Sequence, residues 1–219
     1  MSNTFPDRAY AGRLLADALE KYARRDDVII LALPRGGVPV GSEVARRLGL
    51  NLDVVLVRKL SMPGQPERSV GAVTAGGVSV VNEVLAYELD LSRAALLAMA
   101  HAEDEELQRR QRAYRGSAPP PDLRNKTAIV VDDGIATGST MRAVVRALRK
   151  DSPARLMAAA PVASARAAEL VRAEVDELVI LQTPKELKNI GEWYDRFDAV
   201  TDAEVIGLLE EHRKQGMNP

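Results

Sequence analysis

The stretch Thr127–Thr140, TAIVVDDGIATGST, decides the fold of this 219-residue chain. It opens with an apolar β-branched run, which is typical of a buried strand, and Asp132 and Asp133 follow where that strand would end. The turn after them is made of Gly and hydroxyl residues and leads into an expected helix over 141–150. Backbone N–H groups and the dipole at a helix start favour an anion, and paired carboxylates suit sugar hydroxyls or hydrated Mg²⁺. A ribose that carries phosphate satisfies the whole pattern.

Composition excludes several classes of function. The chain has 30 basic and 31 acidic residues, so it lacks the basic surplus expected of proteins that bind nucleic acid or anionic membranes. It has no cysteine, which excludes disulfides, thiolate metal sites and cysteine nucleophiles. Two histidines, His101 and His212, are too few for a histidine metal cluster, and we expect both at the surface. No signal-peptide core and no apolar run of membrane-spanning length is present, so we expect a cytoplasmic protein.

Further apolar runs flank the central one and alternate with helices. They lack the polar–apolar alternation of half-exposed strands, as expected for strands covered on both faces. These runs cover residues 28–33, 51–57, 154–162 and 177–181. Together with the central strand they predict an α/β fold with an open parallel sheet of about five strands flanked by helices. Loops 34–41, 58–70 and 132–140 would then meet at the carboxyl edge of the sheet, where such folds bind ligands.

The segments between the strands carry their own signals. Helices are expected over 7–24, 42–48, 83–111 and 164–173, with a break at 90–92 in the third. Residues 60–69 are polar and broken by Pro and Gly, which predicts a loop, and Gly-Gly between β-prone arms predicts a hairpin over 71–81. The charge-dense helix 92–115 is expected to be a solvated amphipathic helix, docked by Leu96, Leu97 and Leu107.

Other phosphate-binding and catalytic motifs fail on spacing. The chain has no Walker P-loop, no G-x-G-x-x-G after the first strand and no G-x-S-x-G elbow. A plain helix N-cap accounts well for one carboxylate, but less well for Asp132 and Asp133 together followed by a TGST turn. The functional interpretation of the two acids is therefore the stronger one.

The segment VVDDGIATGST resembles the phosphoribosyl pyrophosphate (PRPP) signature of the type I phosphoribosyltransferases. The resemblance covers about residues 28–183. It implies a single phosphoribosyltransferase domain over 1–219, with a core of about 28–183 and a small hood over the acceptor formed by about 1–25 and 184–219. It also implies a homodimer, which is the habit of this family.

The same resemblance assigns roles to the donor side of the site. Asp132 and Asp133 would hold the ribose hydroxyls, directly or through Mg²⁺ as cofactor. The 5-phosphate would be bound by the turn that comprises Ala136, Thr137, Gly138, Ser139 and Thr140. Arg35, Gly36 and Gly37 would form the pyrophosphate loop, in which the family often has a non-proline cis peptide, here Pro34–Arg35.

Two cations at the end of the second strand complete this set. Arg58 and Lys59 would neutralise charge on the departing pyrophosphate, although a solvated strand end is an equal alternative. Arg35, Lys59 and Asp133 are thus the expected catalytic residues. The loop 60–69, with Glu67 and Arg68, is the candidate for a lid over the site.

The acceptor side is less determined. The 6-oxopurine enzymes of the family commonly have an acid just before the TG of the signature, where this chain has Ala136, so a hypoxanthine/guanine-type mechanism is in doubt. Trp193 in the tail is a candidate to cover an acceptor ring, with packing of the tail as an equal alternative. Phe5, Arg8 and Tyr10 are weaker candidates for the hood.

The sequence therefore predicts transfer of a phosphoribosyl group from PRPP to an acceptor nitrogen, with pyrophosphate released. The acceptor would be a nucleobase, as in nucleotide salvage. The alternative is a non-catalytic regulator that senses PRPP or a nucleotide on the same fold. A hydrolase of phosphoribosyl compounds would need a water-activating base, for which the sequence offers no candidate.

Overall fold

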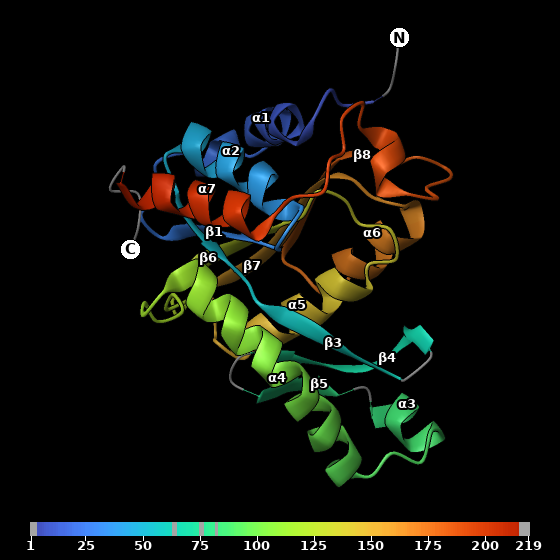
Figure 1. Ribbon diagram of the computed structural model, residues 1–219. Coiled ribbons are helices and arrows are strands. Elements are labelled where there is room, and N and C mark those ends of the chain that lie inside the picture. The colour runs from blue at the N-terminus through green and yellow to red at the C-terminus, as the bar shows by residue number, and fades with distance from the viewer. Residues whose placement is uncertain (1–3, 63–64, 75–76, 82, 215–219) are drawn as a thin grey trace.

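A computed structural model describes residues 4–62, 65–74, 77–81 and 83–214. Its centre is a five-stranded, wholly parallel sheet (Figure 1). In spatial order the strands are β2 (Asn51–Val54), β1 (Val28–Ala32), β6 (Thr127–Val131), β7 (Arg155–Val162) and β8 (Glu177–Gln182). The predicted open α/β sheet of about five strands is confirmed.

Helices cover both faces of this sheet. One face carries α1 (Arg8–Ala18), α2 (Gly37–Leu48) and α7 (Asp202–Lys214), and the other carries α5 (Ser139–Arg149) and α6 (Ala165–Arg172). Every residue of β1 and β6 is buried, because successive side chains point into two different cores. Ile30 belongs to the core under α2, whereas Ile29 and Leu31 belong to the core under α5.

A second, antiparallel sheet stands beside the first and corrects the sequence prediction. It consists of β3 (Val57–Met62), β4 (Gln65–Thr74) and β5 (Gly77–Val81). The loop predicted for 60–69 is wrong, since Leu60 pairs with Gly71 and is buried. Register shifts on both sides of Ser61 mark irregular pairing, and residues 63 and 64 lie outside the described residues. The hairpin predicted over 71–81 is confirmed as the β4–β5 pair.

The long helical region after this sheet breaks where predicted. It forms α3 (Glu83–Glu88) and α4 (Arg93–Arg115), and the Ser92 side chain caps α4 by accepting from the Ala95 amide at 3.1 Å. Leu96 and Leu107 are buried, but Leu97 is 54% exposed, so its predicted docking role is wrong. Helix α4 packs against the antiparallel sheet and α7 (Figure 1).

Several boundaries differ from the prediction. Helix α2 begins at Gly37 rather than residue 42, because Pro39 falls in its first turn, where proline is tolerated. Strand β2 ends at Val54, and β3 starts separately at Val57. Helix α1 ends at Ala18 and is followed by the 3₁₀ helix η1 (Glu20–Tyr22).

His212 is a correction as well. The sequence predicts it at the surface, but it is only 3% exposed, because α7 packs on α2 and brings its Nε2 atom 3.0 Å from the Ser42 hydroxyl. His101 is exposed, as predicted.

The N-terminal segment before α1 lies against residues 190–197. Phe5 and Tyr194 form a parallel β-bridge, and their rings lie 5.5 Å apart between centroids. The 3₁₀ helix η2 (Ile190–Trp193) belongs to the same cluster, in which Trp193 is partly buried. That these ends form a hood on one domain stays a prediction.

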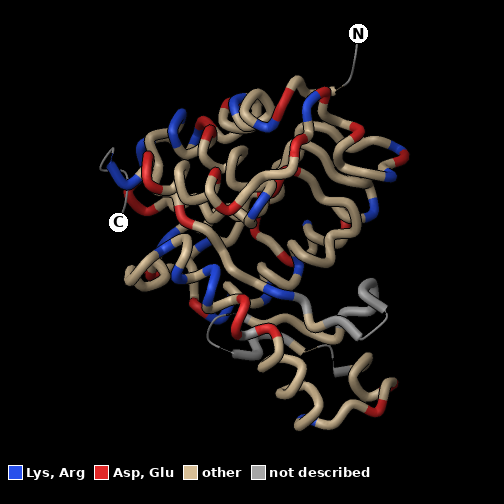
Figure 2. The backbone as a smooth tube through the Cα atoms, in the orientation of Figure 1, with Lys and Arg blue, Asp and Glu red and all other residues tan. Residues whose placement is uncertain are grey.

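Charges of both signs are spread over the described fold (Figure 2). No helix among the described residues is long and apolar enough to cross a membrane. This distribution agrees with the near-neutral net charge of the sequence.

Candidate functional site

The loops that follow β1 and β6 touch at the carboxyl edge of the sheet. A Cβ atom added to Gly36 would lie 2.0 Å from Oδ2 of Asp133, and one added to Gly37 would lie 2.7 Å from the Val131 carbonyl oxygen. At Gly37 an added Cβ would meet backbone, so glycine is required there, whereas at Gly36 it would meet the Asp133 carboxylate, which would have to move. The peptide bond Pro34–Arg35 is cis, as expected from the sequence. The predicted meeting of these two loops is therefore correct.

The two acids form a tight, partly buried pair. Oδ1 of Asp132 accepts the Asp133 backbone N–H at 2.9 Å. Burial, and then the neighbouring Asp133 charge, raise the pKa of Asp132 well above its ordinary value. Burial also raises the pKa of Asp133, while Arg8 opposes that shift. Both carboxyls are thus harder to ionise than an ordinary aspartate, and a nearby cation or hydroxyl donors would favour their charged form.

Arg8, from the first turn of α1, supplies a cation to this pair. Its Nε atom donates to Oδ2 of Asp133 at 2.8 Å, and the two side chains are 11% and 14% exposed. Its Nη1 atom donates to the Asp198 carbonyl oxygen at 2.8 Å, and its guanidinium lies 3.8 Å from the Phe197 ring centroid. The sequence suggests Arg8 only as a hood residue, because a contact across 125 positions leaves no local signal.

Tyr194 fixes the acid pair from the other end of the chain. Its hydroxyl donates to the Asp133 carbonyl oxygen at 2.6 Å. Burial, followed by the Asp133 charge, raises the pKa of Tyr194, so the phenol stays protonated and remains a donor. Next to it, the Ile190 side chain packs closely on Gly134. A Cβ atom added to Gly134 would lie 2.6 Å from two carbon atoms of Ile190. Both chain ends therefore contact the residues that follow β6.

The turn after the acids has the form of an anion cradle. Gly138 is the N-cap of α5 with φ +76°, a conformation that favours glycine, and it offers no side-chain acceptor to the first amides of the helix. The first turn of α5 contains no acidic residue. Thr137 and Ser139 place their hydroxyl oxygens 3.0 Å apart. Thr140 is half-buried at the start of the helix, and Ala136 is exposed.

Two of the predicted cations, Arg35 and Arg58, lie next to acids of α7 and α4, respectively. Arg35 is exposed, and its Nη1 atom lies 4.0 Å from Oδ1 of Asp202. Asp202 also accepts from the Tyr114 hydroxyl at 2.5 Å and from Nη2 of Arg109 at 3.2 Å. Arg58 pairs with Glu103 of α4 at 2.7 Å. Lys59 lies in β3 opposite Ala72, and its side chain lies outside the described residues, as do those of Glu67 and Arg68.

Part of the charged face of α4 lines a cavity instead of facing solvent. Arg110 lines a small cavity that Pro34, Arg58 and Thr140 also line. Glu106 orients Arg110 by accepting from its Nε atom at 2.6 Å. The sequence places these charges on a solvated face, because nothing local shows that the helix lies across the end of β1.

Trp193 does not contact the acids through any bond found in the described residues. Its carbonyl oxygen accepts the Phe5 amide at 2.8 Å, and its side chain is partly buried among apolar residues of both chain ends. An open cleft of about 240 Å³ is lined by Arg8, Pro39 and Glu204, among others. Arg8 connects this cleft to the acid pair, because it also donates to Asp133, and the cleft is therefore a candidate place for an acceptor.

The acid pair fits a magnesium ion that brings its own ligands. Mg²⁺ is usually held by one or two carboxylates together with substrate phosphates and water. Asp132 and Asp133 supply such carboxylates, and the described residues contain no cluster of three or more His, Cys, Asp or Glu that would form a complete metal cage. The donor set is thus compatible with Mg²⁺ that enters with a phosphorylated substrate.

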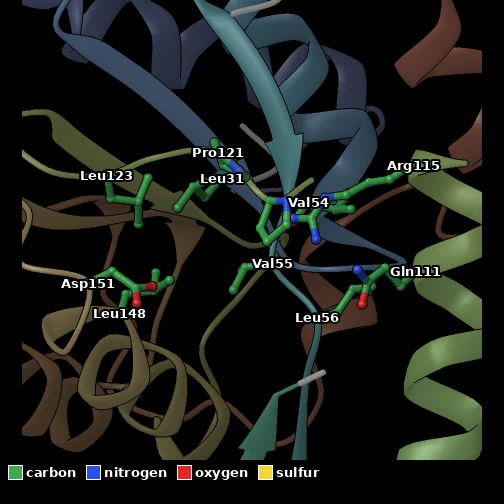
Figure 3. Close-up of a pocket in the computed structure, with 11 residues that line it drawn as sticks. Leu31, Val54, Val55, Leu56, Gln111, Arg115, Pro121, Leu123, Leu148 and Asp151 are labelled. Atoms are coloured by element: carbon green, nitrogen blue, oxygen red, sulfur yellow. The ribbon is translucent and has the colours of Figure 1, made fainter. Parts of the chain in front are cut away.

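A further cavity lies away from the acid pair. It measures about 320 Å³ and is lined mainly by Leu, Val and Pro side chains, with Gln111, Arg115 and Asp151 as polar groups (Figure 3). No residue predicted for the site lines it. The carboxyl edge, where the glycine loop approaches the acid pair, is therefore the candidate functional site.

Comparison with known proteins agrees with this geometry. The family model described as "Phosphoribosyl transferase domain" matches residues 8–195. The Mycobacterium tuberculosis H37Rv protein named "Putative phosphoribosyl transferase Rv0571c" is 38% identical over 206 residues, which are 94% of this chain and 46% of that protein. The chain thus spans about half the length of this curated relative.

Two solved structures resemble the chain. The crystal structure of TT1426 from Thermus thermophilus is 39% identical, covers 95% of this chain and 98% of its own, and superposes with a TM-score of 0.83. The AQ2163 protein of Aquifex aeolicus is 10% identical, with coverage of 84% and 78% and a TM-score of 0.51. The second likeness shows a common fold alone.

Proposed function

Since the chain belongs to the phosphoribosyl transferase domain family, we propose that it binds PRPP with Mg²⁺ and transfers the phosphoribosyl group to an acceptor nitrogen, with release of pyrophosphate. The observation that carries this proposal is the contact between Gly36 and Asp133, where an added Cβ would lie 2.0 Å from the carboxylate. It brings a candidate pyrophosphate loop and a candidate ribose-binding acid to the same point of the sheet edge.

Each part of the donor has a matching group in this proposal. Asp132 and Asp133 bind the ribose hydroxyls, and the turn 136–140 with the α5 N-terminus binds the 5-phosphate. Bound Mg²⁺ would help to neutralise the pyrophosphate. The chain's own cations on that side are Arg35, held near Asp202, and Arg58, held by Glu103.

The reaction replaces one bond to C1 of the ribose by another. The C1–O bond to pyrophosphate breaks with its electron pair leaving on oxygen, and a lone pair of the acceptor nitrogen forms the new bond to C1. The buried acids hold the ring while positive charge develops on it, and the arginines bind the leaving group. Lys59 is proposed as a further cation on that side. Residues 60–69 keep their proposed role as a cover, now as part of a hairpin.

The acceptor is proposed to be a nucleobase that enters the cleft beside Arg8. Ala136 lacks the acid that the resemblance associates with 6-oxopurine acceptors, which favours other bases. Trp193 is proposed to act on the acceptor side, since it belongs to the same cluster as Tyr194, which bonds Asp133. A homodimer, and one domain over residues 1–219, are part of the same proposal.

Thermal unfolding with PRPP and Mg²⁺ tests the donor half of the proposal. Ligand that binds the native state raises the melting temperature by mass action. At about one hundred times the dissociation constant the gain is about 2.7 kcal/mol, or roughly 5–11 °C for a chain of this size. Asp133→Asn should lose most of the shift. No shift of the wild type at millimolar PRPP would refute donor binding.

An acceptor screen tests the transfer half. Pyrophosphate release from PRPP is followed with each common base, and Trp193→Ala should lower the rate while keeping the PRPP-induced thermal shift. An unchanged rate with every acceptor would make Trp193 purely structural. Silence across the screen, with a PRPP shift present, would favour the non-catalytic PRPP sensor.

A further inference from the structure

Arg8 is held so that its charge stays on the acid pair. Three contacts fix the guanidinium: Oδ2 of Asp133 at 2.8 Å, the Asp198 carbonyl oxygen at 2.8 Å, and the Phe197 ring at 3.8 Å. Its side chain is only 11% exposed. Because charge, hydrogen bond and stacking all orient the same planar group, Arg8 has little freedom to leave.

The positive charge of Arg8 stabilises the ionised form of the two acids. Burying two adjacent carboxylates without a counter-ion is costly, and such groups are paired or bind metal. Among the residues that the structure describes, no other Lys or Arg forms an ion pair with Asp132 or Asp133. Among the described residues, Arg8 is therefore the cation that offsets the repulsion between the two acids.

This arrangement competes with a free metal ion. Oδ2 of Asp133 is engaged by Arg8, and Oδ1 of Asp132 is engaged by the Asp133 amide. Mg²⁺ loses its water reluctantly, whereas a guanidinium is weakly hydrated and suits a dry site. A bare Mg²⁺ ion would have to displace a fixed guanidinium or lie beside it.

We propose that Arg8 is the resident counter-ion of the acid pair, and that it prevents Mg²⁺ from binding there until substrate phosphates supply further ligands. The inference rests on the proposed function for the identity of the substrate, but not for the competition itself. Arg8 then acts as a positioning residue: it holds Asp133 in place and keeps the empty donor site free of metal.

The alternative is an ordinary ion pair that fastens α1 to the sheet. Both roles predict that Arg8→Gln lowers the stability of the protein. Only the counter-ion role predicts that the variant gains a response to Mg²⁺ alone, because the acids then lack a cation.

The test measures thermal unfolding of the full chain without substrate, in MgCl₂ and in NaCl of equal ionic strength. Wild type should show no difference between the two salts. Arg8→Gln should be stabilised by MgCl₂, by roughly 3–6 °C at ten times the dissociation constant. Arg8→Lys should behave more like wild type, since it keeps the charge. Arg13→Gln is the matched control: it removes the same charge from the same helix, but Arg13 lies over the Tyr10 ring rather than on the acids.

Two results would overturn the proposal: a specific Mg²⁺ stabilisation of wild type, or no Mg²⁺ response of folded Arg8→Gln.

If Arg8→Gln does not fold, Arg8→Gln/Asp133→Asn replaces it. Removing one acid removes the need for the counter-ion, so this double variant should fold and be more stable than Arg8→Gln. Failure to recover stability would also refute the counter-ion role.

Adding PRPP separates this inference from the proposed function. A PRPP shift in wild type with no Mg²⁺ response in Arg8→Gln would leave the function standing and remove the inference. The expected Mg²⁺ responses with no PRPP shift in any variant would support the counter-ion role and refute PRPP binding.

Discussion

Replacing Gly36 by Ala should separate the pyrophosphate loop from the acid pair. The new Cβ would lie 2.0 Å from Oδ2 of Asp133, while real contacts of this kind are essentially never below 3.0 Å. The carboxylate or the loop must therefore move by about 1 Å. The backbone itself accepts alanine, because Gly36 has φ −61° and ψ −33°, an ordinary helical conformation.

The cost follows from what that movement breaks. The Arg8–Asp133 bond is charge-assisted and part-buried, and losing it costs about 1.5–3 kcal/mol. Crowding of a packed site adds about 1–3 kcal/mol. The lower entropy of the unfolded alanine variant offsets up to about 1 kcal/mol. A net loss of about 1.5–6 kcal/mol corresponds to a melting temperature roughly 3–24 °C lower.

Thermal unfolding and PRPP titration calorimetry measure the two effects. The control is Gly207→Ala in α7, where nothing lies within 4 Å of an added Cβ, and which should gain about 0.5–1 kcal/mol. The cost of Gly36→Ala should shrink in an Arg8→Gln background, because Asp133 is then free to retreat. A Gly36→Ala protein as stable and as responsive to PRPP as wild type would show that the loops are not in contact.

Three further predictions concern residues outside the acid pair. Burial, and then the hydrogen bond to Asp202, raise the pKa of Tyr114 to about 12, so Asp202→Asn should let the phenol ionise at lower pH in an absorbance titration. Arg115→Leu should cost about 3–5 kcal/mol in urea unfolding, because it leaves Asp53 part-buried without its partner, and adding Asp53→Leu should recover part of the loss. Burial lowers the pKa of His212 in the folded protein below its ordinary value of 6.5. The unfolded chain therefore binds more protons below pH 6.5, and the wild type should lose stability as the pH falls below 6.5. His212→Gln should flatten this pH dependence, and an equal slope in both proteins would refute it.

The core of the fold was accessible from sequence because its signals are local. The runs at 28–33 and 127–131 are apolar without alternation, and each contains a strand buried on both faces. The same is true of the break at 90–92, since Ser92 caps the following helix through a residue only three positions away. Parallel topology then brings the predicted loops to one edge.

Predictions from local sequence patterns were wrong where strand pairing or helix packing decides the structure. Proline and glycine in 60–69 predicted a loop, but pairing of Leu60 with Gly71 and burial of Leu60 outweigh that preference. His212 looked like a surface residue of a terminal helix, and only the packing of α7 on α2 buries it beside Ser42.

By itself, the stretch 127–140 determined the strand and the two acids at its end and predicted the phosphate cradle, because each depends on residues close together in the chain. Only the tertiary structure decided what neutralises the acids and what holds the arginines. Arg8 reaches Asp133 across 125 positions, and Asp202 lies near Arg35 from the opposite end of the chain. Charge pairs at such separations depend on how the elements pack, and no pattern along the chain records them.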